Sequence, residues 1–211
     1  MKYCGWVLFV YLIILGEPVF GQDRIAVAVP IASPPVIDGV LDEPFWTRVD
    51  PVTGFLQRDP VDGAPASEKT EIRIAYTPTA LYFGMTMYDS EPGLIRGNIL
   101  QRGGWIDKDD NIRIALDTYD DDRNAYMFEV GVLGTQDDAL ISDESSTDWN
   151  WDGIYTTETR ITDEGWVLEI EIPFTTIRFD DTEAPEMGIA IARTIRRKNE
   201  SVFWPHIGQE Y

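Results

Sequence analysis

Cysteine is nearly missing from this sequence, and the one example, Cys4, lies in an N-terminal apolar segment that we expect to be removed. A mature chain without cysteine forms no disulfides, so its fold must depend on a buried apolar core. Histidine is equally scarce, with His206 alone. These shortages exclude a zinc site built from Cys and His, and they leave a Ser-His-Asp site without support.

Basic residues are also few, with 17 Lys and Arg against 37 Asp and Glu and a formal net charge of -20. A surface of this sign repels phosphate backbones and anionic lipids, so we expect no nucleic-acid partner. Neutral sugars, cations and basic partners remain open. Acidic residues are so abundant that none stands out as a pair for glycoside hydrolysis, and we expect no catalysis.

Long apolar runs are missing after the first residues. The run from Trp6 to Leu15 follows Lys2 and precedes Val19-Phe20-Gly21, where a small residue suits cleavage. The run is too short to span a bilayer and is typical of a secretory signal peptide, with a short buried helix as the alternative. We therefore expect residues 1–21 to be a signal peptide and the protein to be exported, periplasmic, cell-surface or outer-membrane-associated.

Alternating apolar and polar residues indicate about nine strands, with turn signals roughly every 8 to 12 residues. Residues 58–67 and 135–150 show no period and are expected to be loops, and Asp42 is expected to cap a short helix. The pattern favours an all-β, jelly-roll-like antiparallel sandwich over residues 22–211 with one or two short helical turns. The predicted strands are 24–35, 71–76, 81–88, 111–117, 125–130, 155–161, 166–172, 187–196 and 201–204.

The central pair of strands carries the strongest functional signal. Counting across the acidic turn at residues 118–124 places Arg113 and Glu129 nearly opposite each other on the outward face. Trp105 stands just before the first of these strands. An aromatic ring beside a paired Arg and Glu on an open sheet face is typical of a site for a polar ligand. Plain packing is the alternative for Trp105.

Other residues are secondary candidates. Trp149 and Trp151 alternate, so in an extended chain they would face the same way and widen a binding surface, although they could also anchor a loop. Acidic runs could hold structural calcium, and a solvated acidic loop is the alternative. An EF-hand starting at Asp107 is excluded, because its sixth position is Ile112 instead of Gly and its twelfth is Thr118 instead of Glu. The runs are Asp120 to Asp122, Asp137-Asp138 and Asp143-Glu144.

Four stretches, taken in their order and spacing, resemble the family 9 carbohydrate-binding modules. They are Val36-Ile-Asp-Gly-Val-Leu-Asp-Glu-Pro-Phe-Trp46, the hairpin of residues 68–89 with Ala-Leu-Tyr-Phe at 80–83, the stretch 105–117, and the strand from Gly165 to Pro173. The resemblance covers about residues 30 to 208. It is greatest to the version found at the N-terminus of bacterial envelope proteins, in which an outer-membrane β-barrel follows.

The resemblance implies a non-catalytic module that stacks a sugar between two tryptophans, and it places Trp105 and Trp204 at those positions. Arg113 and Glu129 would then orient the sugar hydroxyls, in the reverse order to the family's sugar binders, and Arg193 is a further ligand candidate. It also implies that calcium can be present. Finally, it suggests that a C-terminal membrane β-barrel follows and that this chain is a fragment of a longer protein.

Three rival functions remain at this point. The domain could be an accessory or interaction module of the barrel protein without sugar binding. It could instead be attached to a glycoside hydrolase that acts in carbohydrate catabolism. Related sandwiches also bind haem through Met or His, but Met85 and Met87 read as core residues here.

Overall fold

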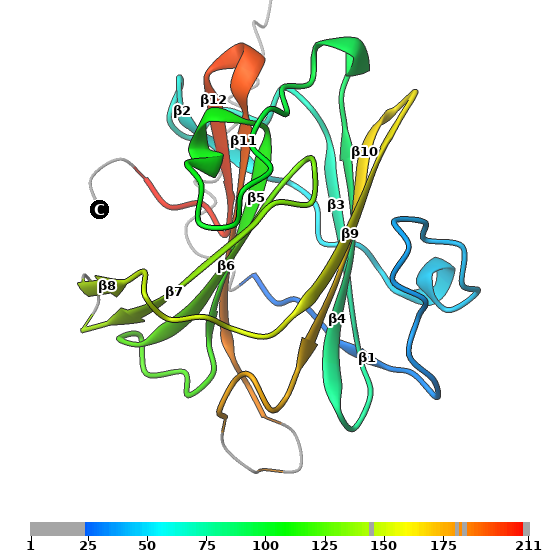
Figure 1. Cartoon of the computed structure of the whole chain (residues 1–211), viewed down its shortest axis with the longest axis vertical. Helices are drawn as coiled ribbons and strands as arrows, with labels where there is room; N and C mark the ends of the chain where they lie inside the picture. The colour runs from blue at the N-terminus through cyan, green and yellow to red at the C-terminus, as the bar shows by residue number, and fades with distance from the viewer. Residues whose placement is uncertain (1–23, 144–145, 180–181, 183–184, 209–211) are drawn as a thin grey trace, which may run out of the picture.

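Two β-sheets pack face to face in the computed structural model, which describes residues 24–143, 146–179, 182 and 185–208 (Figure 1). The predicted signal peptide, residues 1–21, lies outside the described residues. Over the described part of the chain, helical structure consists of single 3-10 turns. These are η1 (Trp46–Arg48), η2 (Pro92–Leu94), η3 (Ile106–Lys108) and η4 (Arg196–Lys198). The predicted all-β sandwich is confirmed.

The smaller sheet, called sheet A here, has five strands in the order β1-β3-β4-β10-β9. Neighbouring strands in it are antiparallel, apart from β1, which pairs parallel with β3. Its strands are β1 (Val29–Pro30), β3 (Thr70–Tyr76), β4 (Ala80–Tyr88), β10 (Gly165–Pro173) and β9 (Thr156–Thr162).

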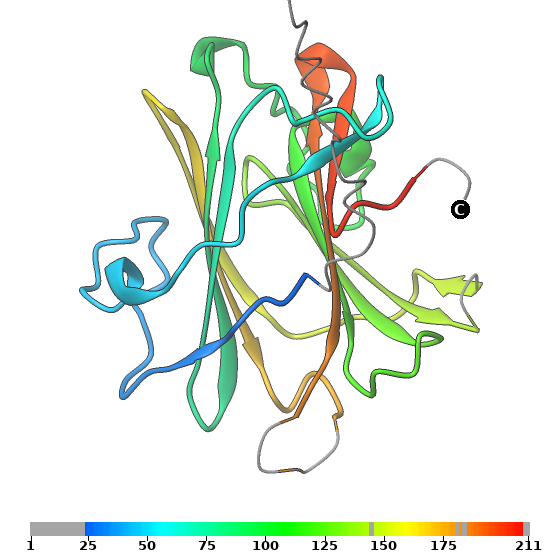
Figure 2. The same cartoon turned by 180° about the vertical axis from the view of Figure 1, so that it is seen from behind.

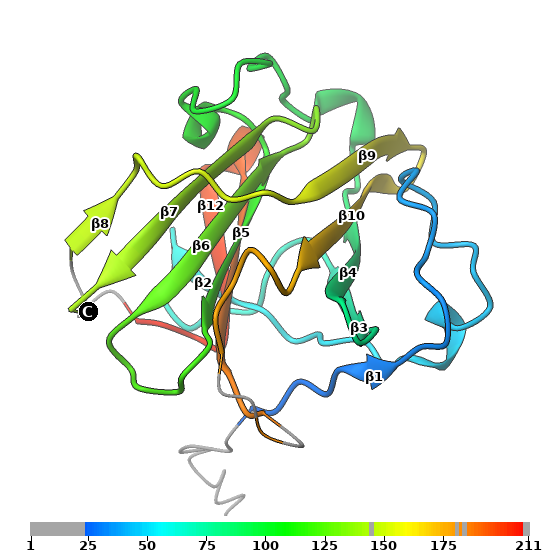
Figure 3. The same ribbon diagram turned by 60° about the horizontal axis from the view of Figure 1, so that its bottom comes forward.

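The larger sheet, called sheet B, has seven antiparallel strands in the order β2-β12-β11-β5-β6-β7-β8. Figure 3 shows the chain leaving the edge of sheet B after β8 and entering the edge strand β9 of sheet A. Its strands are β2 (Leu56–Asp59), β12 (Glu200–Trp204), β11 (Gly188–Ile195), β5 (Asn111–Asp117), β6 (Ala125–Gly131), β7 (Gln136–Ser142) and β8 (Ser146–Asp148).

The sequence-based prediction of a loop at 135–150 is wrong, because β7 and β8 lie there. No apolar period marks β7, since its inward-facing Asp138 is a buried carboxylate that accepts hydrogen bonds from the Gly153 N–H at 2.5 Å and from Arg102 at 2.7 Å. The loop predicted at 58–67 likewise begins inside β2. The helix expected from Asp42 is reduced to the three residues of η1, capped at Phe45 without a side-chain hydrogen bond.

The main core fills the space between the sheets, because alternate residues of each strand point inward. In β5, for example, Ile112 and Ile114 are fully buried, whereas Arg113 and Ala115, which alternate with them, are partly exposed. Ile170 of β10 and Phe83 of β4 are fully buried in the same cluster from the side of sheet A.

A second, smaller core covers the outer face of sheet A. Figure 2 shows the segment that carries η1 on the side of sheet A that faces away from sheet B. Trp46 is 2% exposed and packs with Tyr82 of β4. A Cβ at Gly84 would lie 2.8 Å from Leu41 Cδ2 and 3.1 Å from the Trp46 ring. Glycine is therefore required for the close approach of this segment, and Trp46 is a core residue of this second cluster.

A buried carboxylate fixes the same segment to the sheet. Glu169 of β10 is fully buried, and its Oε2 accepts hydrogen bonds from the Asp38 and Gly39 N–H groups at 3.0 and 2.9 Å. Burial raises the pKa of Glu169, and these two donors act in the opposite direction. The segment thus covers part of the outer face of sheet A, whose edge strand β9 keeps exposed residues, and the outer face of sheet B is also partly open.

Candidate functional site

One row of side chains runs straight across the outer face of sheet B. Strand pairing places Phe203 beside Ala192, Ala192 beside Arg113, Arg113 beside Glu129 and Glu129 beside Asp137. The row therefore passes over β12, β11, β5, β6 and β7 in turn. It changes along its length from an aromatic ring through a small residue to a base and two acids. The predicted opposition of Arg113 and Glu129 is confirmed by the register.

An ion pair forms the middle of this row. Arg113 Nη2 lies 2.9 Å from Glu129 Oε2, and the Arg113 side chain is 41% exposed. Glu129 is only 3% exposed, and its Oε1 has no hydrogen-bond partner, as is also true of Arg113 Nε. Such orphaned polar atoms are rare in buried positions and indicate a place where a further group can bind.

The two acids of the row, Glu129 and Asp137, both have raised pKa values. Burial raises the pKa of Glu129, Arg113 opposes this shift, and the charges of Asp137 and Asp107 add to it. Burial also raises the pKa of Asp137, with a further contribution from Asp138. Titratable groups with perturbed pKa values beside an open surface are typical of binding sites, although ion-pair networks perturb them too.

The η3 turn forms a wall beside the row. Its Ile106 is 2% exposed and lies over Gly131 of β6, where a Cβ would be 3.2 Å from Ile106 Cγ2. Gly131 follows Glu129 by two residues and shares its face of the sheet. The Asn111 amide donates to the carbonyl oxygens of Ile106 and Asp109 at 3.2 and 3.1 Å, which fixes the turn to the end of β5.

The loop that precedes η3 is fixed by Asp109, the residue that follows the turn. The Asp109 carboxylate accepts hydrogen bonds from the Asn98 and Ile99 N–H groups, both at 2.6 Å. Asp109 is 3% exposed, so these hydrogen bonds compensate for the burial of its charge. These hydrogen bonds therefore fix the start of the loop, at residues 98–99, to its end at Asp109.

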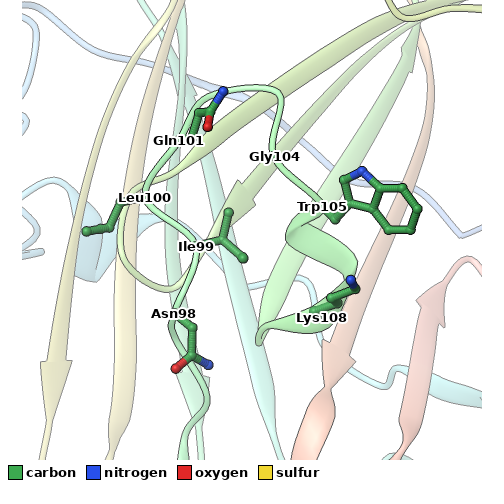
Figure 4. Close-up of a pocket in the computed structure, with 7 residues that line it drawn as sticks. All are labelled: Asn98, Ile99, Leu100, Gln101, Gly104, Trp105 and Lys108. Atoms are coloured by element: carbon green, nitrogen blue, oxygen red, sulfur yellow. The ribbon is translucent and has the colours of Figure 1, made fainter.

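Trp105 projects from this wall with 72% of its surface exposed. Lys108 Nζ lies 4.6 Å from the centroid of the indole ring, so a cation–π contact occupies one face of the ring. Figure 4 shows both side chains at a pocket of about 580 Å³, with the Trp105 ring directed away from the limb that carries residues 98–101. The pocket is lined by Asn98, Ile99, Leu100, Gln101, Gly104, Trp105 and Lys108.

Trp204 does not lie on this face. It is 4% exposed, pairs with Ile191 of β11, and belongs to the main core. Its position is incompatible with the role of a second stacking plate, because the alternation of β12 turns its side chain inward. The outward position on β12 is taken by the partly exposed Phe203, whose ring centroid lies 5.6 Å from Arg58 Cζ.

Arg193 is fully buried and is not available to a ligand. It lies on β11 but donates hydrogen bonds to sheet A: to the Lys69 carbonyl at 3.0 Å, to Thr70 Oγ1 at 3.0 Å and to the Tyr88 carbonyl at 2.7 Å. Burial lowers the pKa of Arg193 to about 10, against the opposing charges of Asp110 and other nearby acids. Its expected ligand role is therefore replaced by a structural one.

The remaining tryptophans separate from each other. Trp149 is 51% exposed, whereas Trp151 is half-buried and packs on Tyr126 and Phe128, with ring centroids 5.3 and 5.8 Å apart. The chain turns at Trp149 and Asn150, so the two rings do not share one face as an extended chain would require. Trp151 closes the end of the core.

The acidic runs do not fit a metal site in the part of the chain that the structure describes. There, no group of three or more His, Cys, Asp or Glu side chains could hold a metal ion. Asp121 accepts hydrogen bonds from the N–H groups of Arg123 and Asn124, at 2.8 and 2.9 Å. Asp143 pairs with Arg123 at 2.6 Å, and Glu144 of the predicted run lies outside the described residues.

Two outward-facing residues were missed by the sequence analysis. Phe203 could have been found from the alternation of residues 201–204, in which it and Trp204 must point opposite ways. The outward position of Asp137 could not have been found, because the acidic composition of β7 leaves no apolar period from which to recognise a strand.

The described residues include no helix with the length and apolarity that a membrane span needs.

Comparisons with known proteins identify the family and the fold. A family model described as "Carbohydrate family 9 binding domain-like" matches residues 37–201. A comparison with curated proteins finds no match.

Solved structures share the fold at low sequence identity. A carbohydrate binding module family 9 from Caldicellulosiruptor kristjanssonii in complex with cellotriose is 16% identical, with a TM-score of 0.62 over 85% of this chain and 83% of that one. The same organism's module in complex with glucose gives 17% identity and a TM-score of 0.61 over 85% and 84%. A putative carbohydrate-binding protein from Bacteroides uniformis ATCC 8492 gives 14% identity and a TM-score of 0.63 over 78% and 81%.

The family model spans most of the sequence, and solved modules of the family share the fold. The chain therefore belongs to the family 9 carbohydrate-binding-domain-like proteins.

Proposed function

We propose that this domain binds carbohydrate without catalysis, on the outer face of sheet B beside η3. The observation that carries the proposal is the exposed Trp105 at the start of η3, the turn that packs on β6 beside the in-register row of Arg113, Glu129 and Asp137. Family membership and the likeness to modules solved with cellotriose and glucose support it.

The chemistry of the row suits a sugar. The C–H face of a pyranose ring stacks on the free face of the Trp105 indole, while Lys108 covers the other face. Arg113 donates hydrogen bonds to hydroxyl oxygens, and the carboxylates accept from hydroxyl hydrogens through charge-assisted bonds. The small side chain of Ala192 next to Arg113 leaves space above the sheet for the ring.

Isothermal titration against mono- and oligosaccharides tests the proposal. Replacing Trp105 with Ala is expected to weaken binding by about fivefold or more, since stacking on an aromatic ring contributes about 1 kcal/mol or more. A matched control is Tyr76→Ala, which removes a partly exposed aromatic ring from the end of β3 in sheet A. Equal heats for Trp105→Ala and the unaltered protein would remove the site.

One observation favours the second candidate function, an interaction module that does not bind sugar. Trp204 faces the core, so Trp105 has no tryptophan partner across the site, and Leu100 beside it is 76% exposed. A patch of this kind also suits contact with a protein. Absence of heat with every sugar, together with retention of an envelope protein on immobilised domain but not on Trp105→Ala, would favour this alternative.

Export is part of the proposal and rests on the N-terminal sequence alone. A carbohydrate module acts on extracellular or envelope glycans, and cleavage after Gly21 would release a chain starting at Gln22. The mass of the protein recovered from an envelope fraction tests this, because an uncleaved chain would retain the mass of residues 1–21.

A further inference from the structure

The acidic part of the row carries more negative charge than its basic neighbours balance. Arg113 pairs with Glu129, but Asp137 follows Glu129 in the same row and Asp107 of η3 acts on Glu129 as well. Lys108, the other base at this place, lies over the Trp105 ring. The charge of Arg102 also acts on Asp137, but Arg102 forms its own ion pairs with Asp138 and Asp152. Glu129, Asp137 and Asp107 therefore outnumber the base that is ion-paired within this group, Arg113.

The Glu129 carboxylate is only partly paired. Glu129 is 3% exposed and keeps Oε1 without a partner, although one oxygen of the same carboxylate binds Arg113. The Asp137 side chain accepts from the Asp138 N–H at 3.0 Å through Oδ1. Asp137 is partly exposed and Asp107 is exposed, so a ligand on the sheet face can reach both. Glu129 is buried, so it would act on a ligand through its charge and not through direct contact.

We propose that the sugar bound here carries a free amino group, protonated to an ammonium, and that uronic acids are excluded. This inference rests on the proposed function of the same face. A hydroxyl donates one hydrogen bond and leaves the charge in place, whereas an ammonium donates three and neutralises one of the carboxylates. A uronate would add a fourth negative charge beside Asp137 and Asp107.

Affinities for matched pairs of sugars test the inference. Isothermal titration compares glucosamine with glucose and galactosamine with galactose, below the pKa of the sugar amine, with N-acetylglucosamine and glucuronate as further probes. At low ionic strength each amino sugar is expected to bind roughly tenfold more tightly than its neutral parent, with glucuronate weakest. The preference should shrink at about 0.5 M salt, because partly exposed charges are screened.

A variant separates this place from the general charge of the chain. Asp137→Asn is expected to reduce the amino-sugar preference to less than half. Asp163→Asn, which removes the same charge from the exposed turn between β9 and β10, is the control and should keep the preference.

The outcomes distinguish the two proposals. Neutral and amino sugars binding equally well would overturn the ammonium inference and leave carbohydrate binding standing. A preference that survives in Asp137→Asn would also overturn it, because the amine would then be recognised elsewhere. Binding of no sugar at all would overturn both.

Discussion

Arg193 on β11 reaches through the interior and donates to the Tyr88 carbonyl of β4 at 2.7 Å, so a charged side chain joins the two sheets. Two further hydrogen bonds from the same guanidinium, to the Lys69 carbonyl and to Thr70 Oγ1, complete the connection. Nearby acids balance the charge, since Asp110 and Asp89 both act against the pKa shift that burial causes.

Replacement of Arg193 should therefore be costly. We expect Arg193→Ala to lower the free energy of unfolding by about 3–5 kcal/mol, because two carbonyls and the Thr70 hydroxyl lose their donor and the nearby Asp110 and Asp89 lose a compensating charge. Urea unfolding followed by fluorescence measures this. Arg48→Ala, at an exposed arginine, is the control and should change stability by less than about 0.5 kcal/mol. Similar midpoints for the two variants would show that Arg193 is not a structural link.

Two tryptophans should respond in opposite ways to removal. Trp204→Ala is expected to lower stability by about 3–5 kcal/mol, since its ring fills the core. Trp105→Ala should cost less than about 0.5 kcal/mol, because its ring is 72% exposed. Thermal or urea unfolding separates the two variants, and a large loss of stability in Trp105→Ala would mean that the ring has a structural role.

Gly84 should not tolerate a methyl group. Gly84→Ala would bring a Cβ within 2.8 Å of Leu41 Cδ2 and 3.1 Å of the Trp46 ring, and we expect a loss of about 1–3 kcal/mol. Limited proteolysis should then cut the 31–49 segment more rapidly. Gly93→Ala is the matched control, because a Cβ there would meet nothing within 4 Å. Unchanged cleavage in Gly84→Ala would show that the segment can adjust without leaving the sheet.

The raised pKa of Glu129 predicts a dependence of stability on pH. An acid whose folded-state pKa lies above its unfolded pKa contributes most to stability below the unfolded pKa, which for glutamate is ordinarily near 4.5. This contribution to stability is lost as pH rises through the folded-state pKa. Glu129→Gln cannot titrate. The stability of the unaltered protein relative to Glu129→Gln should therefore fall as pH rises from about 4 to 7.

Unfolding of both proteins in urea at several pH values measures this difference. A constant difference across the range would contradict the assignment, because it would mean that Glu129 titrates alike in the folded and unfolded chains. Glu158→Gln, at the partner position of Glu169 on β9, removes an exposed carboxyl from sheet A and is the control.

Local patterns were enough to predict the central elements of the fold. Ile112 and Ile114 alternate with polar residues, so their strand and the opposition of Arg113 and Glu129 could be derived by counting. β7 could not be found in this way, because the buried Asp138 interrupts its inward face and is compensated by partners distant in sequence, Gly153 and Arg102.

The candidate site was predictable only where it depends on residues close in sequence or on a single pair of consecutive strands. Trp105 was placed by its neighbours in sequence, whereas the inward turn of Trp204 depends on how β12 pairs with β11. Arg193 was predicted to be a ligand candidate from the family resemblance. Its burial could not be predicted from its own strand, because the acceptors that make it tolerable come from β3 and β4.

The covering of the outer face of sheet A by the 31–49 segment has a practical consequence. Trp46, Leu41 and Gly84 pack together there, so a fusion partner or solid support attached near the exposed Val36 would hold the molecule on the side away from sheet B. The opposite surface would then point toward the medium. Immobilisation through this end should leave glycan capture intact, and the same orientation would suit a domain displayed from a larger assembly.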